Sequence, residues 1–156
     1  MKVRIATSND VPLIFSFIQK KAEFDRSLGA FSGTLQTNEA KISKTLFEAF
    51  PFSYVLFAEN LEREVVGFAL YGFRYSSFAG QPSIWLDDLY VEGAMRNQGA
   101  GTALMNYLAG VAKDNNCTHL GWHADDRNVR ALQFYHRLGA AIVQQNGNRC
   151  TLEWKP

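Results

Sequence analysis

The sequence predicts an α/β fold whose strands and helices follow the order β-α-α-β-β-β-α-β-α-β-β. Three features of the chain lead to this prediction: short runs rich in β-branched and aromatic residues, longer runs with apolar residues three or four positions apart, and a glycine-rich turn between one strand and one helix. With 156 residues, 47% of them hydrophobic, we expect one ordinary domain over 1–156 with its own core.

The first part of the chain predicts one strand and two helices. Residues 2–6 alternate like a strand, and a Ser-Asn-Asp sequence followed by proline marks the start of a helix over 8–23. We expect five apolar residues on the buried face of this helix, namely Val11, Ile14, Phe15, Ile18 and Ala22. After a loop over 27–36, a second helix carrying Ile42, Leu46 and Phe50 is capped by Thr37 and ended by Pro51.

The rest of the chain predicts a strand meander followed by alternating helices and strands. The strands are expected over 52–58, 65–75, 83–91, 118–123, 141–144 and 149–154, and the helices over 99–114 and 128–137. Gly139 suits the left-handed residue that ends the last helix.

Charge and cysteine content exclude several classes of protein. Sixteen Lys and Arg against 15 Asp and Glu give a net charge of +1, which offers no electrostatic argument for binding nucleic acid or an anionic membrane. Cys117 and Cys150 are too few and too far apart for a disulfide scaffold or a zinc site, so we expect reduced core residues. No apolar leader and no run of transmembrane length is visible, which predicts a cytoplasmic protein without membrane partners.

A candidate phosphate-binding turn lies at residues 96–101, Arg-Asn-Gln-Gly-Ala-Gly. It follows a strand that begins with two acidic residues and opens the helix predicted over 99–114. Gly99 and Gly101 allow a ligand to approach the backbone closely, and the amides of residues 98–102 point from a helix N-terminus, where the dipole favours anions. The arrangement predicts binding of a diphosphate.

A second motif follows after 27 residues and runs from Asn128 through Phe134-Tyr135 to Gly139-Ala. Together with the glycine turn and the order of elements, it resembles the acetyl-coenzyme A site of the GNAT superfamily of N-acetyltransferases. The resemblance covers the whole chain. It implies the GNAT fold, a single mixed central β-sheet flanked by helices.

The resemblance assigns residues to acetyl-CoA. It implies that the pyrophosphate binds the turn made by Arg96, Asn97, Gln98, Gly99, Ala100, Gly101 and Thr102. The main chain of Leu89, Tyr90 and Val91 is expected to pair with the pantetheine arm, and one of these amides to polarise the thioester carbonyl. Asn128 is expected both to cap its helix and to contact the cofactor, with Ala131 nearby. No metal is expected, because His119 and His136 have no partners at metal-binding spacing.

Two roles are compatible with the position of Tyr135 in the sequence, a core residue and a proton donor. An aromatic residue on the inner face of a helix is commonly part of the core. The resemblance instead implies that this tyrosine protonates the departing CoA thiolate. Ordinary pKa values of about 10 for tyrosine and about 8.5 for a thiol are compatible with that proton transfer.

An amine acceptor also needs a base, because forming the free amine at neutral pH costs about 4.6 kcal/mol for a group with a pKa near 10.4. Asp87 and Asp88 are candidates, and strand alternation sends them to opposite faces. Resemblance of Trp85-Leu-Asp-Asp-Leu-Tyr-Val to the spermidine/spermine acetyltransferase branch selects Asp87 as the base. Asp88 is expected to have a structural role.

The same branch resemblance implies an acceptor pocket lined by five residues besides Asp87, namely Phe24, Asp25, Phe78, Trp85 and His123. For Phe24 and Phe78, plain core packing is an equal alternative. His123 is expected to assist proton transfer or only to hydrogen-bond at a strand end. Arg26 follows Asp25 and is expected to neutralise it partly, which favours a short diamine or a thialysine-like amino acid over a long polyamine.

These observations predict direct transfer of an acetyl group from acetyl-CoA to a small primary amine within a ternary complex. Cys117 is not placed to carry the acetyl group. Two alternatives remain open: an acetyltransferase for a protein lysine or N-terminal amine, and an acyl-CoA-binding regulatory module without turnover. Members of the branch are usually homodimers, so we expect a homodimer.

Overall fold

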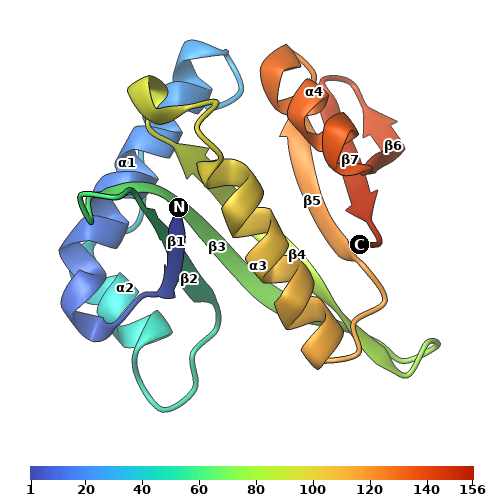
Figure 1. The fold of residues 1–156 in the computed structure, drawn as a ribbon, viewed down its shortest axis with the longest axis horizontal. Helices are drawn as coiled ribbons and strands as arrows, with labels where there is room; N and C mark the ends of the chain where they lie inside the picture. The colour runs from blue at the N-terminus through green and yellow to red at the C-terminus, as the bar shows by residue number, and fades with distance from the viewer. The chain divides into compact units, whose positions relative to one another are not determined.

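Seven strands and four α-helices make up the computed structural model, which describes residues 1–156 (Figure 1). The strands are β1 (Lys2–Ile5), β2 (Tyr54–Glu59), β3 (Val65–Ser76), β4 (Gln81–Val91), β5 (Leu120–Asp125), β6 (Ala141–Asn146) and β7 (Arg149–Trp154). The α-helices are α1 (Val11–Ser27), α2 (Glu39–Leu46), α3 (Ala100–Asp114) and α4 (Val129–Leu138). Two short 3-10 helices, η1 (Ser8–Asp10) and η2 (Gly93–Met95), precede α1 and α3.

The strands form one sheet in the order β1-β2-β3-β4-β5-β7-β6. β4 and β5 are parallel, whereas β1 with β2, β2 with β3, β5 with β7 and β6 with β7 are antiparallel. The predicted mixed sheet and the predicted order of elements are therefore confirmed. By their internal contacts the residues fall into two compact units, Met1–Tyr71 with Asp88–Leu104, and Gly72–Asp87 with Met105–Pro156.

In the first unit, α1 and α2 supply the helical part of a core that also includes β2 and β3 (Figure 1). Phe17 of α1 is 1% exposed, and its ring centre lies 5.9 Å from that of Phe57 and 5.3 Å from that of Phe68. The predicted buried face of this helix was incomplete, because it included Phe15 and Ile18, which are half-buried, and omitted Phe17.

The helix ends differ from the predicted ones for local reasons. α1 continues to Ser27, four residues further than expected, and is followed by Gly29 with a φ of 75°. The prediction that Thr37 caps α2 is wrong, because the side chain of Asn38 accepts the Lys41 N–H at 2.8 Å. α2 also ends earlier than predicted, which leaves Phe50 outside the helix and 86% exposed.

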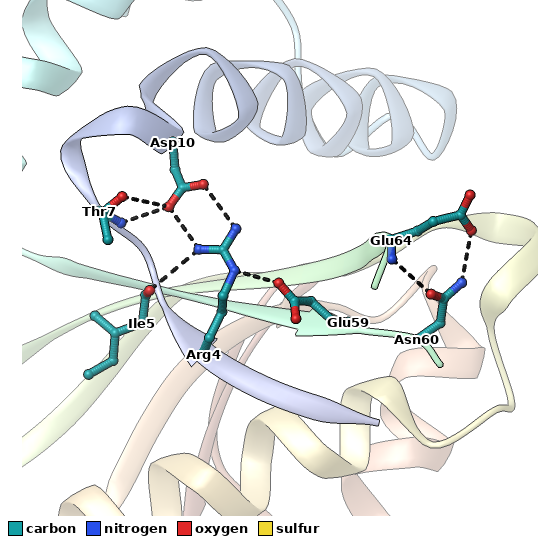
Figure 2. Close-up of polar contacts among 7 residues, drawn as sticks. All are labelled: Arg4, Ile5, Thr7, Asp10, Glu59, Asn60 and Glu64. Atoms are coloured by element: carbon teal, nitrogen blue, oxygen red, sulfur yellow. Dashed lines mark hydrogen bonds and ion pairs between the residues drawn. The ribbon is translucent and has the colours of Figure 1, made fainter. Parts of the chain in front are cut away.

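Arg4 joins the first strand to the start of α1 and to the end of β2 (Figure 2). Its Nη1 and Nη2 donate to the Asp10 carboxylate at 2.8 and 2.9 Å, and its Nε donates to Glu59 at 2.5 Å. The Thr7 N–H donates to the same Asp10 carboxylate at 2.7 Å. Hydrogen bonding to the Arg4 guanidinium lowers the pKa of Asp10.

Replacing Arg4 by methionine is expected to lower the free energy of unfolding by about 1–3 kcal/mol, because two partly buried carboxylates lose a charged donor. Since the folded-state pKa of Asp10 is lowered, this stabilisation is present above about pH 4 and is lost as the pH falls through the folded pKa. Urea denaturation at pH 7 and at pH 3, with Arg63→Met in the exposed β2–β3 turn as control, measures both effects. An equal loss in the two variants at pH 7 would contradict the role of Arg4.

In the second unit, β5 pairs with β4 on one side and with β7 on the other, and α4 packs near them (Figure 1). Leu120 and Trp122 of β5 are buried, and the Trp122 ring centre lies 4.9 Å from that of Tyr135 on α4. The alternate residues Trp85, Asp87 and His123 are only partly buried or exposed. Two adjacent strands thus present one buried and one accessible face.

The structure also bears on the predictions for Gly139, for the two cysteines and for membrane-spanning helices. Gly139 ends α4 with a φ of 93°, which confirms the left-handed cap. Cys150 is buried, Cys117 is partly buried, and neither forms a disulfide. None of the helices is both long and apolar enough to cross a membrane.

Candidate active site

The glycine turn leads into the N-terminus of α3, which begins at Ala100. Gly99 has a φ of 89° and Asn97 a φ of 63°, so the backbone makes a left-handed turn there. The Ala103 N–H donates to the Gly99 carbonyl at 2.9 Å and closes the first helical turn. The amides of residues 100–102 therefore precede the first intrahelical donor and, with the helix dipole, form a set of donors of the kind that binds anions.

A Cβ built on Gly99 meets no atom within 4 Å. Glycine is needed there for the positive φ and not because neighbouring atoms crowd the position. Space in front of the turn is compatible with a ligand that approaches its amides. Binding of a diphosphate by residues 96–102 stays a prediction.

Arg96 links this turn to β4. Its Nε donates to the Val91 carbonyl at 3.0 Å, and its guanidinium carbon lies 4.8 Å from the ring centre of Phe24 and 5.7 Å from that of Tyr90. Part of the Arg96 side chain is thus used to fix the turn against the strand. The predicted phosphate contact depends on the remaining terminal N–H groups.

Phe24 and Asp25 lie at the end of α1 with different surroundings. Phe24 is half-buried and stands edge-on to Tyr90, with ring centres 6.3 Å apart. Asp25 forms an ion pair with Lys21, whose Nζ also lies 3.9 Å from the Asp88 carboxylate. One lysine therefore lies near both Asp25, which was expected in the acceptor pocket, and Asp88, which was expected to have a structural role.

The expectation that Arg26 neutralises Asp25 is wrong. Arg26 instead pairs with Glu23 at 3.4 Å, donates to the Gly33 carbonyl at 2.9 Å and lies over the ring of Phe31. The helix directs residues 25 and 26 about 100° apart, whereas Lys21 and Asp25 share a face because they are four residues apart. This spacing was a signal that the sequence prediction did not use.

Asp87 belongs to an accessible cluster in the second unit. Partial desolvation raises the pKa of its carboxyl, while a hydrogen bond from Trp85 and the positive charge of Arg74 act in the opposite direction. The Arg74 guanidinium carbon lies 3.4 Å from the centre of the Trp85 ring. A raised pKa makes Asp87 a somewhat better proton acceptor than an ordinary aspartate.

His123 on β5 lies next to Trp85 in the same unit. The two ring centres are 4.8 Å apart in an edge-on arrangement, and His123 Nδ1 shares a 3.2 Å hydrogen bond with the Thr151 hydroxyl. Burial and the charges of Arg149 and Arg74 lower the pKa of His123. His123 is therefore neutral at pH 7, and its expected help in proton transfer stays a prediction.

Asn128 and Tyr135 occupy opposite ends of α4. The Asn128 side chain accepts the Ala131 N–H at 3.1 Å, which confirms its capping role. Tyr135 is 7% exposed and packs on Trp122, so its ring is part of the core of this unit. Core packing of the ring and proton donation by the hydroxyl are compatible, and the second remains a prediction.

Phe78 does not pack in the core. It stands in the turn between β3 and β4 and is fully exposed, so the core-packing alternative is wrong for this residue. Arg74, which no motif predicted, contacts Trp85 instead. The two residues meet only because β3 and β4 pair, and no local sequence signal could have indicated that contact.

A separate cavity of about 610 Å³ lies in the second unit, beside the C-terminal half of α3. Its lining includes Lys113, Cys117, His119 and Lys155. None of the predicted site residues belongs to it, so the cavity gives no support to the predicted site. Across the described residues 1–156, no group of three or more His, Cys, Asp or Glu side chains is placed to hold a metal ion.

Comparisons with known proteins identify the family to which this chain belongs. The profile described as "Acetyltransferase (GNAT) family" matches residues 24–140. Thialysine N-epsilon-acetyltransferase of Bos taurus is 32% identical over 156 aligned positions, covering 95% of this chain and 89% of that protein. L-ornithine N5-acetyltransferase NATA1 of Arabidopsis thaliana is 25% identical, covering 92% of this chain and 81% of that protein.

A solved structure with a similar fold is an aminoglycoside acetyltransferase from an uncultured soil metagenomic sample. Its TM-score is 0.74 at 20% sequence identity, with 93% of this chain and 91% of that chain covered. At this identity the similarity concerns the fold alone.

Proposed function

We propose that this chain, which belongs to the acetyltransferase (GNAT) family, transfers the acetyl group of acetyl-CoA to a primary amine of a small molecule. Membership of this family and the similarity to these relatives support an acetyl-transferring enzyme that acts on amines. Thialysine and ornithine, named for two relatives, both carry such an amine on an amino-acid side chain. A small amino acid or diamine is the acceptor class that these names support.

The observation that carries the acetyl-CoA part of the proposal is the turn before α3. Its left-handed Gly99 and the amides of residues 100–102 offer donors at the positive end of a helix dipole. A diphosphate is the part of acetyl-CoA that such a donor set recognises. When bound, acetyl-CoA supplies the activated acetyl group as a thioester.

Direct transfer needs a proton acceptor for the amine and a proton donor for the thiolate. In our proposal Asp87, with its raised pKa, takes the ammonium proton directly or through water. Tyr135 donates to sulfur. Burial raises the pKa of the Cys117 thiol, which keeps it protonated and makes it a poor carrier of an acetyl group.

The charges near the end of α1 favour a short acceptor. A polyamine needs several uncommitted carboxylates along its length, but Asp25 and Asp88 both lie near Lys21. This arrangement supports a small amino acid or diamine. Incubation with acetyl-CoA and a panel of amino acids, diamines, polyamines and peptides, followed by detection of free CoA thiol, tests the function.

Replacing Asp87 by asparagine is expected to lower kcat/KM by roughly 10²–10³-fold at pH 7, because the amine then loses its proton acceptor. The deficit should shrink as the pH rises toward the pKa of the amine, where free amine is already present. A pH profile of kcat/KM for the wild type and Asp87→Asn measures this change. A deficit of the same size at every pH would assign Asp87 to acceptor positioning.

We further infer that residues 1–156 act as one catalytic domain, in the cytoplasm and as a homodimer. The edge strand β6 supports the homodimer, because its Ile142 and Val143 are 50% and 53% exposed and edge strands are ready to pair. Light scattering coupled to gel filtration determines the oligomeric state.

A further inference from the structure

Arg74 is an exposed residue of β3 whose guanidinium group lies over the ring of Trp85. Its guanidinium carbon is 3.4 Å from the centre of the Trp85 ring, and its side chain makes no hydrogen bond or ion pair within the chain. A guanidinium stacked in this way keeps its N–H groups directed outward in its own plane. The fork of donors is therefore fixed in position and available to a ligand.

The Trp85 ring that holds Arg74 is itself fixed. Trp85 is paired with Gly121 in the register of β4 and β5, and a Cβ at Gly121 would lie only 3.3 Å from the ring. His123 contacts the ring edge-on at 4.8 Å. The absence of a side chain at position 121 thus lets the indole lie against β5.

The carboxylate of Asp87 lies on the same face of β4 as this indole. Asp87 is two residues beyond Trp85, and the Trp85 side chain acts to lower the pKa of Asp87 against the larger effect of desolvation. No ion pair within 4.0 Å joins Asp87 to Arg74. One cationic and one anionic group are therefore presented side by side, and each remains able to bind a ligand group of opposite charge.

Two guanidinium groups lie near this cluster. Arg74 and Arg149 both act to lower the pKa of His123, and Arg74 also acts on Asp87. A diamine carries only positive charge and meets repulsion from both guanidinium groups. An amino acid with a terminal amine offers an ammonium to Asp87 and a carboxylate to Arg74.

We propose that Arg74 is a specificity-determining residue that binds the carboxylate of an amino-acid acceptor, so that the enzyme favours such acceptors over diamines of the same length. This inference rests on the proposed function and narrows its acceptor class. Arginine suits the role because its planar fork matches a carboxylate with two parallel hydrogen bonds.

The test compares acceptors that differ only in the carboxylate, L-ornithine with 1,4-diaminobutane and L-lysine with 1,5-diaminopentane. The wild type should have the higher kcat/KM for each amino acid. In Arg74→Gln, kcat/KM for the amino acids should fall roughly 10- to 100-fold, mainly through KM, while the values for the diamines change by no more than about twofold. Arg74→Lys should recover part of the loss, and Arg63→Gln, which removes one exposed arginine elsewhere, should change neither class.

Three kinetic results would overturn the inference: a wild type that prefers the diamines, an unchanged amino-acid kcat/KM in Arg74→Gln, or an equal loss for both classes. Failure of the wild type to acetylate any amine would contradict the proposed function. In that case calorimetric binding of L-ornithine decides the inference. Binding that weakens about 10-fold or more in Arg74→Gln supports it, whereas equal or undetectable binding by the two proteins overturns it.

Discussion

Replacing Tyr135 by phenylalanine is expected to lower turnover by roughly 10²–10⁴-fold, the loss typical of removing a positioned acid or base. The phenylalanine ring keeps the packing against Trp122, whose ring centre lies 4.9 Å away, and against Phe134. Only the hydroxyl is removed. The free energy of unfolding should therefore fall by no more than about 1.5 kcal/mol, the usual size of one hydrogen bond.

Turnover is measured by release of CoA thiol at saturating acetyl-CoA and amine. Tyr107→Phe is the matched control, because Tyr107 is also a helical tyrosine but lies in α3 and is 36% exposed. Its turnover should equal that of the wild type. Near-normal turnover in a folded Tyr135→Phe protein would leave Tyr135 as a packing residue alone.

The parts of the fold that the sequence predicted well depend on local signals. Gly139 was expected to end α4 in a left-handed conformation, and Asn128 was expected to cap the start of that helix. Both features are present. In the turn before α3, Gly99 has a left-handed conformation, which glycine adopts without steric cost. Such a cap is decided by neighbouring residues, so where a single residue suits the position it can be predicted from the sequence.

Errors arose where adjacent residues compete or where contacts are distant. Thr37 and Asn38 are both good caps, and the loop geometry that selects Asn38 has no clear sequence signal. The exposed position of Phe78 is set by the turn between β3 and β4, which hydrophobicity alone does not reveal. To predict whether a residue such as Phe78 is exposed, one must know which strands pair and where the turn between them lies.

For the charged residues of the candidate site, too, local features could be predicted from the sequence whereas contacts with distant residues could not. Alternation along β4 predicted that Asp87 and Asp88 have different surroundings. Asp88 lies 3.9 Å from Lys21, whereas Asp87 contacts Trp85 and feels the charge of Arg74. The sequence could separate the two acids, but it could not name their basic neighbours. The expectation of a short acceptor is unchanged, but Lys21 and not Arg26 is the basic residue that reduces the negative charge available to a polyamine.

Replacing Gly101 by glutamate is expected to weaken binding of acetyl-CoA at least about 100-fold. A carboxylate in the first turn of α3 places a negative charge within roughly 5 Å of a diphosphate bound to its amides, which costs about 3 kcal/mol at a partly exposed site. The same charge interacts favourably with the helix dipole, so the ligand-free protein should not lose stability. Lost binding with retained stability is the distinguishing result.

Thermal and chemical unfolding with and without acetyl-CoA measure this effect. At a concentration 100 times the wild-type Kd, acetyl-CoA should stabilise the wild type by about 2.7 kcal/mol and Gly101→Glu by no more than about 0.4 kcal/mol. Gly110→Glu is the matched control, because Gly110 lies in the same helix and a Cβ there meets no atom within 4 Å. The control should bind acetyl-CoA like the wild type, since its new charge is more than two helical turns from the amides. If Gly101→Glu keeps the wild-type affinity, the diphosphate binds elsewhere, and the turn before α3 has only a structural role.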